Sequence, residues 1–148
     1  MTAWLRAGFV LLVAWQAGAG LWAAVFPEGF FGSFPVPSHA WVSMFPPYNE
    51  HLVRDFGLAL LQCVPVTVVC IRYPERRFVR AVLIGLLLFS VSHALFHEAH
   101  VVRTDDLLLQ RVFLLFPVVL AVVLLYLSWK SPVDRPDHVE EPTPTAAP

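Results

Sequence analysis

Long apolar segments alternate with short polar ones along this chain of 148 residues. A helix of about 20 apolar residues is long enough to cross about 30 Å of hydrocarbon. Four segments have about this length: Ala7–Phe26, which has no charged residue, and approximately Leu52–Ile71, Phe78–Phe96 and Leu107–Trp129. The pattern therefore predicts an all-α protein, a four-transmembrane-helix bundle that occupies residues 1–130.

The composition agrees with a membrane protein. Hydrophobic residues make up 57% of the chain and charged residues only 14%, which is too apolar for an ordinary soluble domain. The formal net charge is −1, and binding of phosphates requires a concentrated basic face. The lipid bilayer is therefore the expected partner, and no nucleic acid is expected.

The first apolar segment has features of a secretory signal peptide. Arg6 precedes it, and Ala17-Gly18-Ala19 imitates a cleavage site. The apolar run continues to Phe26, beyond the length of a usual signal core, so a retained helix is favoured.

Basic residues predict the orientation of the spans. They flank the first and fourth spans and crowd the connection between the second and third: Arg6, Arg72, Arg76, Arg77, Arg80 and Lys130. By the positive-inside rule these regions are cytoplasmic. Both termini are then cytoplasmic, and loops 27–51 and 97–106 lie outside. A composition rich in Arg, Ala, Val, Leu and Pro favours a bacterial cytoplasmic membrane.

Of two segments outside the spans, we expect one to be folded and the other to be disordered. Residues 27–50 are rich in aromatic residues and proline, so we expect a folded outer loop with its rings at headgroup depth. Residues 131–148 are polar and proline-rich, and cannot bury enough apolar surface to fold. We expect a disordered cytoplasmic tail there.

Histidines and carboxylates at the outer ends of two spans are the main candidates for a site. His51 opens the second span, and His93, His97 and His100 share one face at the end of the third. Imidazole and carboxylate ligands suit zinc, iron or copper. We therefore predict a divalent transition-metal site of His51, His93 and His97, with Asp55 or Glu50 as a further ligand or as a partner that orients an imidazole. A haem held between His51 and His93 is a more specific form of this prediction.

Other residues are predicted to support this site. Asn49 follows two prolines and resembles a helix N-cap. Gln62 lies on the same helical stripe as His51 and Asp55. Arg54 is four residues from Glu50 and could pair with it.

Two alternatives to a metal site remain open. The polar residues could form an interfacial network without a ligand, or could handle protons or a solute. In the network interpretation Thr104, Asp105 and Asp106 are an ordinary acidic first turn of the fourth span, and Arg111 balances Asp105 or Glu98. The protein would then be a non-enzymatic accessory membrane protein whose polar cluster braces the outer loop.

Catalytic motifs do not settle whether the chain is an enzyme. His97-Glu98 begins like the zincin motif HExxH, but the position of its second histidine is Val101. Nucleotide-binding glycine loops and the GxSxG motif are absent from the sequence.

The segment Pro47-Tyr48-Asn49-Glu50-His51-Leu52-Val53-Arg54-Asp55-Phe56-Gly57, followed by His93-x-x-x-His97, resembles a group of small four-helix membrane proteins of actinobacterial type. The resemblance extends over about residues 7–129. It implies a four-helix fold and the importance of the motif residues, and it supplies no mechanism. A membrane protein partner or a homo-oligomer is a further expectation.

Overall fold

The computed structural model describes residues 2–102 and 104–130. The tail that the sequence predicts to be disordered, 131–148, lies outside the described residues. Four long helices confirm the predicted spans: α1 (Ala3–Val25), α3 (Glu50–Arg72), α4 (Arg76–Ala99) and α5 (Leu107–Lys130). Each is long and apolar enough to cross a bilayer.

Side chains cap two of these helices at their first residues. The Asn49 Oδ1 accepts a hydrogen bond of 3.1 Å from the backbone N–H of Leu52, and the Thr2 Oγ1 accepts one of 3.4 Å from that of Leu5. Such bonds satisfy donors that have no partner within the helix. The predicted N-cap at Asn49 is confirmed.

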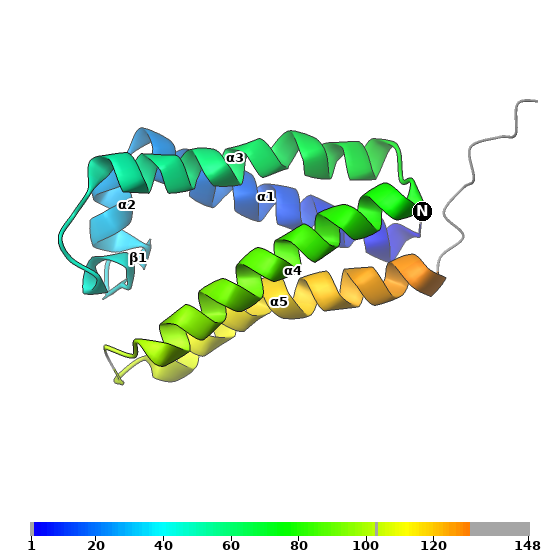
Figure 1. Ribbon diagram of the computed structural model, residues 1–148. Helices are drawn as coiled ribbons and strands as arrows, with labels where there is room; N and C mark the ends of the chain where they lie inside the picture. Colours follow the sequence, from blue (N-terminus) through cyan, green and yellow to red (C-terminus); the bar gives the residue numbers. More distant parts are fainter. Residues whose placement is uncertain (1, 103, 131–148) are drawn as a thin grey trace, which may run out of the picture.

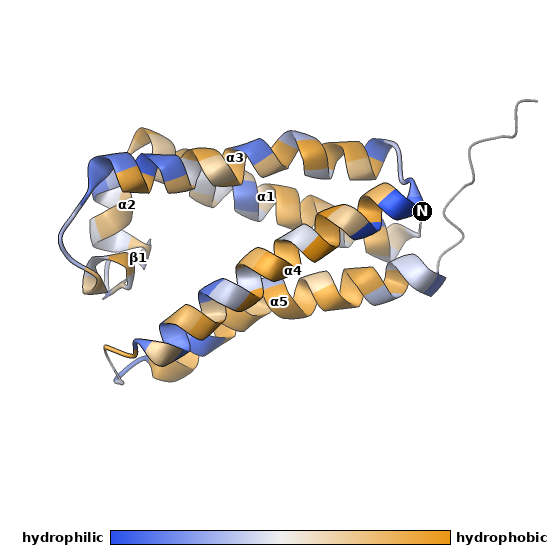
Figure 2. Ribbon diagram, viewed as in Figure 1, coloured by the Kyte–Doolittle hydropathy of each residue, from blue (hydrophilic) through white to orange (hydrophobic). Residues whose placement is uncertain are grey.

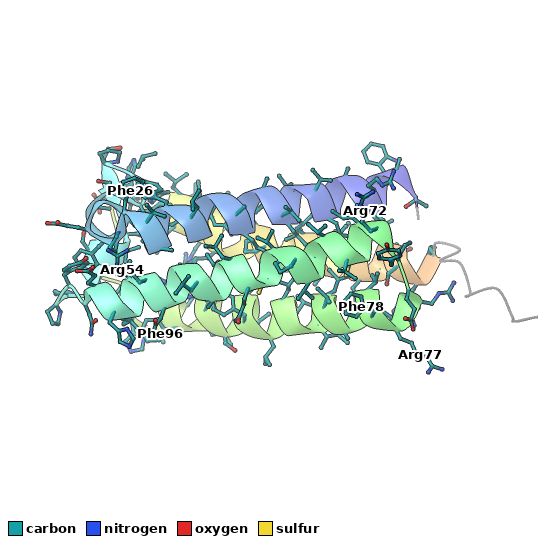
Figure 3. The ribbon with its side chains drawn as sticks, turned by 90° about the horizontal axis from the view of Figure 1, so that it is seen from above. Phe26, Arg54, Arg72, Arg77, Phe78 and Phe96 are labelled. Atoms are coloured by element: carbon teal, nitrogen blue, oxygen red, sulfur yellow. The ribbon has the colours of Figure 1, made fainter. Side chains whose placement is uncertain are left out.

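The long helices form two pairs, α1 with α3 and α4 with α5. The pairs converge at the end where the chain begins and diverge toward the other end (Figure 1). Figure 3 places Arg72 and Arg77 at the first end, here called the arginine end. A core cluster drawn from all four long helices holds that end together: Leu5, Phe9, Leu12, Cys70, Val79, Leu83 and Leu124.

Two glycines allow α1 and α3 to cross closely. A Cβ on Gly57 would lie 2.7 Å from the carbonyl oxygen of Gly20, and a Cβ on Gly20 would lie 2.9 Å from the carbonyl oxygen of Gly57. Small residues at membrane helix crossings allow backbones to approach in this way. A larger residue at either position would push the two helices apart.

Residues 27–49 form a folded segment, here called the cap, at the diverging end of the bundle, the cap end. The cap contains α2 (Pro27–Ser33), the short antiparallel strands β1 (Pro35–Val36) and β2 (His39–Ala40), and the 3₁₀ turn η1 (Val42–Met44). Its Phe30 is buried in a cluster with Ala23 of α1 and Val53 of α3. The cap is therefore packed on the first helix pair.

Hydrophobic residues make up most of the length of the four long helices (Figure 2). Leu88 on α4 and Leu108 on α5 are 73% and 80% exposed. Apolar surface on this scale is unfavourable in water and favourable in lipid. The architecture is that of an integral, multi-pass membrane protein.

Candidate functional site: two buried polar clusters

The histidine at the start of α3 lies on the surface. The His51 side chain is 86% exposed, and its Nε2 lies 3.3 Å from Oδ2 of Asp55. Arg54 is more deeply placed: its Nε donates to Glu50 Oε1 at 2.8 Å, and its Nη1 donates to the carbonyl oxygen of Ala24. The predicted pairing of Arg54 with Glu50 is confirmed, and Arg54 also ties α3 to the end of α1.

The histidines of α4 lie among aromatic rings. The His93 and His97 rings are in edge contact, with centroids 4.7 Å apart. The ring of Phe45 in the cap packs edge-on against His97, with centroids 5.3 Å apart. The Nδ1 of His100 donates to the carbonyl oxygen of Phe96 at 2.8 Å. These imidazoles contact their own helix and the cap.

The predicted metal site is not supported by this arrangement. Over residues 2–102 and 104–130, no three histidine, cysteine, aspartate or glutamate side chains are grouped so that they could hold a metal ion. His51 pairs with Asp55, His93 with His97, and Gln62 lines a cavity farther along α3. Haem binding is not tested by this geometry and stays a prediction.

A different residue, Asp106, is the centre of the polar cluster beneath the cap. Its Oδ2 accepts hydrogen bonds from Trp41 Nε1 at 2.6 Å and from His39 Nδ1 at 2.9 Å. Its Oδ1 accepts one from Gln110 Nε2 at 2.8 Å. Asp106 is 8% exposed. An ionised carboxylate only accepts hydrogen bonds, so three donors match what this buried group requires.

These donors also determine the charge state of Asp106. The hydrogen bond from Trp41 is the largest cause that lowers the pKa of Asp106, and the bonds from Gln110 and His39 act in the same direction. Burial and the neighbouring Asp105 act in the opposite direction but are outweighed. The carboxyl group is therefore ionised at neutral pH.

The cap connects both helix pairs. On the α1–α3 side, the Phe30 ring contacts the ring of Phe56, with centroids 6.0 Å apart. On the α4–α5 side, the Trp41 ring packs edge-on against Phe113, with centroids 5.2 Å apart. Phe45 contacts Phe96 of α4 at 5.6 Å. The cap thus bridges the gap where the two pairs diverge.

An ion pair joins the helices of the second pair. Arg111 donates from Nε and Nη2 to the two carboxylate oxygens of Glu98, each at 2.7 Å. The sequence left Asp105 and Glu98 open as partners of Arg111, and the structure shows Glu98. Both side chains are nearly half exposed, so this pair contributes modestly to stability.

A second buried polar cluster lies in the interior of the spans. The hydroxyl of Thr67 lies 3.0 Å from Gln16 Oε1 and 2.8 Å from the carbonyl oxygen of Cys63. Gln16 and Thr67 are both buried, and Gln16 Nε2 has no hydrogen-bond partner among the residues that the structure describes. Both residues line a cavity of about 560 Å³ to which all four long helices contribute.

Sequence reasoning missed the central residues of both clusters. Asp106 was interpreted as part of an ordinary acidic first turn, although the spacing of Asp106 and Gln110 puts both on one helical face. Gln16 and Thr67 are polar residues within apolar runs, and such residues usually face a partner or a cavity. Their position within apolar spans is a sequence feature by which this cluster could have been predicted.

No protein-family model, curated protein or solved structure matches this chain. The resemblance of residues 47–57 to actinobacterial membrane proteins therefore stays a prediction.

Proposed function

We propose that this protein is a non-enzymatic accessory protein of the membrane, in which buried polar groups brace a structured cap across two helix pairs. The observation that carries the proposal is the set of three hydrogen bonds to Asp106. Two come from the cap, from His39 and Trp41, and one comes from Gln110 within α5. The carboxylate thus fastens the cap to a helix that begins more than 60 residues later.

The other polar groups of the cap end have similar structural roles. Arg54 connects α3 to the last turn of α1, and Arg111 connects α5 to α4. The Arg54 and Arg111 side chains are nearly half exposed, so each bond contributes modestly to stability. These residues form bonds between elements, which is what a bracing network requires.

The proposal includes an orientation. Arg72, Arg77 and Arg80 belong to the arginine end, so the positive-inside rule favours that end in the cytoplasm and the cap outside. In a bacterium this membrane would be the cytoplasmic membrane, and the cap would face away from the cytoplasm. Reporter fusions after residues 40 and 76 test this directly, and a cytoplasmic signal at residue 40 would refute it.

The brace is tested by replacing Asp106 with asparagine. Asparagine has only one side-chain oxygen. It therefore cannot accept the hydrogen bonds from Gln110, Trp41 and His39 that the two carboxylate oxygens accept. We expect amide hydrogen exchange in residues 39–45 of purified Asp106→Asn to accelerate by about tenfold or more, because charge-assisted bonds contribute about 1.5–3 kcal/mol. Exchange in α1 should be nearly unchanged.

Asp105→Asn is the matched control, since it makes the same chemical change at the adjacent, exposed position. It should leave exchange in the cap close to that of the unmodified protein. If the two variants behave alike, the aromatic contacts alone hold the cap and the brace fails as an explanation.

A metal or haem site at the cap end is the second candidate. The observation that favours it is the contact between His93 and His97, one helical turn apart. Protein purified without chelator should then contain zinc, iron or copper that His93→Ala removes. An unchanged content in His51→Ala would exclude His51 from the ligands, and a protein free of metal and haem would end this candidate.

A further inference from the structure

The cavity between the helix pairs lies at the middle of the spans and is lined mainly by apolar side chains, together with a few polar ones such as Gln16, Gln62 and Thr67. Its volume of about 560 Å³ lies within the range of small-molecule sites, about 300–1,000 Å³. Three rings line it, those of Trp15, Phe56 and Phe89. Phe56 and Phe89 come from α3 and α4, and their centroids are 6.5 Å apart. A flat ring could pack against these side chains in offset or edge-on contact.

Gln16 supplies unfilled hydrogen-bonding capacity at the same cavity. The Thr67 hydroxyl has one proton, so it can donate either to Gln16 or to the carbonyl oxygen of Cys63. If the Gln16 amide turns its Nε2 toward Thr67, the hydroxyl accepts that bond and donates to Cys63. In either orientation, one polar atom of the amide is not satisfied by Thr67.

An unsatisfied amide in the interior of a membrane span is unfavourable by several kcal/mol in hydrocarbon. Gln16 is 2% exposed, and its Nε2 has no partner within residues 2–102 and 104–130. Because Gln16 is one of the residues that line the cavity, a molecule bound there is a source of the missing partner once the amide turns toward it. Because the amide can present either its N–H or its oxygen, that partner can be an acceptor or a donor.

We propose that this cavity binds a lipophilic ring compound with a hydrogen-bonding oxygen on its ring, which is the chemistry of quinones, quinols and phenols. The ring lies against Trp15, Phe56 and Phe89, and its oxygen bonds the Gln16 amide. A quinone oxygen accepts from Nε2, and a quinol or phenol hydroxyl donates to Oε1.

Thermal unfolding in lipid nanodiscs tests this site with three probes. Decylbenzoquinone and its quinol have the proposed ring oxygens, and decylbenzene has the ring and the chain without them. We expect the quinone and the quinol to raise the unfolding midpoint in a saturable way, and decylbenzene to have little effect. Gln16→Leu should weaken quinone binding by about tenfold, the loss expected for one buried hydrogen bond.

Two glycines provide a matched pair that leaves the polar cluster intact. A Cβ added at Gly85, which lines the cavity, or at Gly18, which does not, would meet no atom within 4 Å. Both glycines lie within long helices, where leucine is a favourable residue. Gly85→Leu should occupy part of the cavity and weaken quinone binding, whereas Gly18→Leu should bind as the unmodified protein does.

Several outcomes would overturn the proposal. Equal stabilisation by decylbenzene and the quinone would show a purely apolar cavity in which Gln16 has no role. Absence of any saturable effect would mean that water or lipid alone occupies the space. A quinone affinity that Gly85→Leu leaves unchanged would place the quinone elsewhere on the protein.

Discussion

The two buried polar clusters of this protein differ in whether their hydrogen bonds are complete. At the cap end, both carboxylate oxygens of Asp106 have donors. In the interior of the spans, the Gln16 Oε1 lies beside the Thr67 hydroxyl, and its Nε2 has no partner within the described part of the chain. A complete network fixes the elements that contribute to it, and an incomplete one leaves a specific need for another molecule. The first cluster therefore supports a brace and the second a binding site.

The largest expected effect is at Trp41, which provides both a donor to Asp106 and a ring against Phe113. Trp41 is 6% exposed. Trp41→Ala should lower the free energy of unfolding by about 3–5 kcal/mol, the usual loss for a buried tryptophan. Trp4→Ala is the control, because Trp4 is 80% exposed. Chemical denaturation of both variants in detergent measures the difference, and equal losses would remove the cap contact as the cause.

The same substitution, glutamine to leucine, can be made in each cluster, at Gln110 and at Gln16, and the two results can be compared. Gln110→Leu removes the donor to Asp106 Oδ1 and leaves a buried acceptor unpaired, so we expect a loss of about 1–3 kcal/mol. In Gln16→Leu the Thr67 hydroxyl keeps its bond to the carbonyl of Cys63. Without added ligand, its unfolding free energy should stay unchanged or rise, because leucine removes a buried amide that Thr67 satisfies only in part. If Gln16→Leu is the more damaging variant, the Gln16 cluster is structural.

Acidification should loosen the complete cluster. The pKa of Asp106 is lowered in the folded protein, chiefly by the hydrogen bond from Trp41, relative to the ordinary value of 3.8. The unfolded state therefore binds the proton more readily, so the stabilisation by this carboxylate is fully present above about pH 4–5 and declines as pH falls through the folded pKa. The difference in unfolding midpoint between the unmodified protein and Asp106→Asn, measured against pH, should be constant above that range and shrink below it.

The smallest expected effect is at the exposed pair of His51 and Asp55. Both side chains are more than half exposed, and their closest atoms are 3.3 Å apart. Solvent screens such a pair, so Asp55→Asn should change the unfolding free energy by less than about 0.5 kcal/mol. A change as large as that for Gln110→Leu would show that the exposed pair contributes to the cap contact after all.

The sequence by itself determined the four spans, because a run of about 20 apolar residues has one stable arrangement in a bilayer, the helix. It also determined the N-cap at Asn49 and the pair of Arg54 and Glu50, which depend only on neighbours within four residues. The predicted metal site of residues 49–55 and the α4 histidines was inferred from residue types and shared helical faces. Those patterns could not show whether the faces meet.

Only the tertiary structure decided which polar groups are buried together. His39 and Trp41 lie 67 and 65 residues from Asp106, and Gln16 lies 51 residues from Thr67. Contacts over such separations leave no periodic signal in the chain, because they depend on how the helix pairs diverge and where the cap folds. The cavity depends on the same geometry: residues of both helix pairs line it, and the pairs converge at the arginine end and diverge toward the cap.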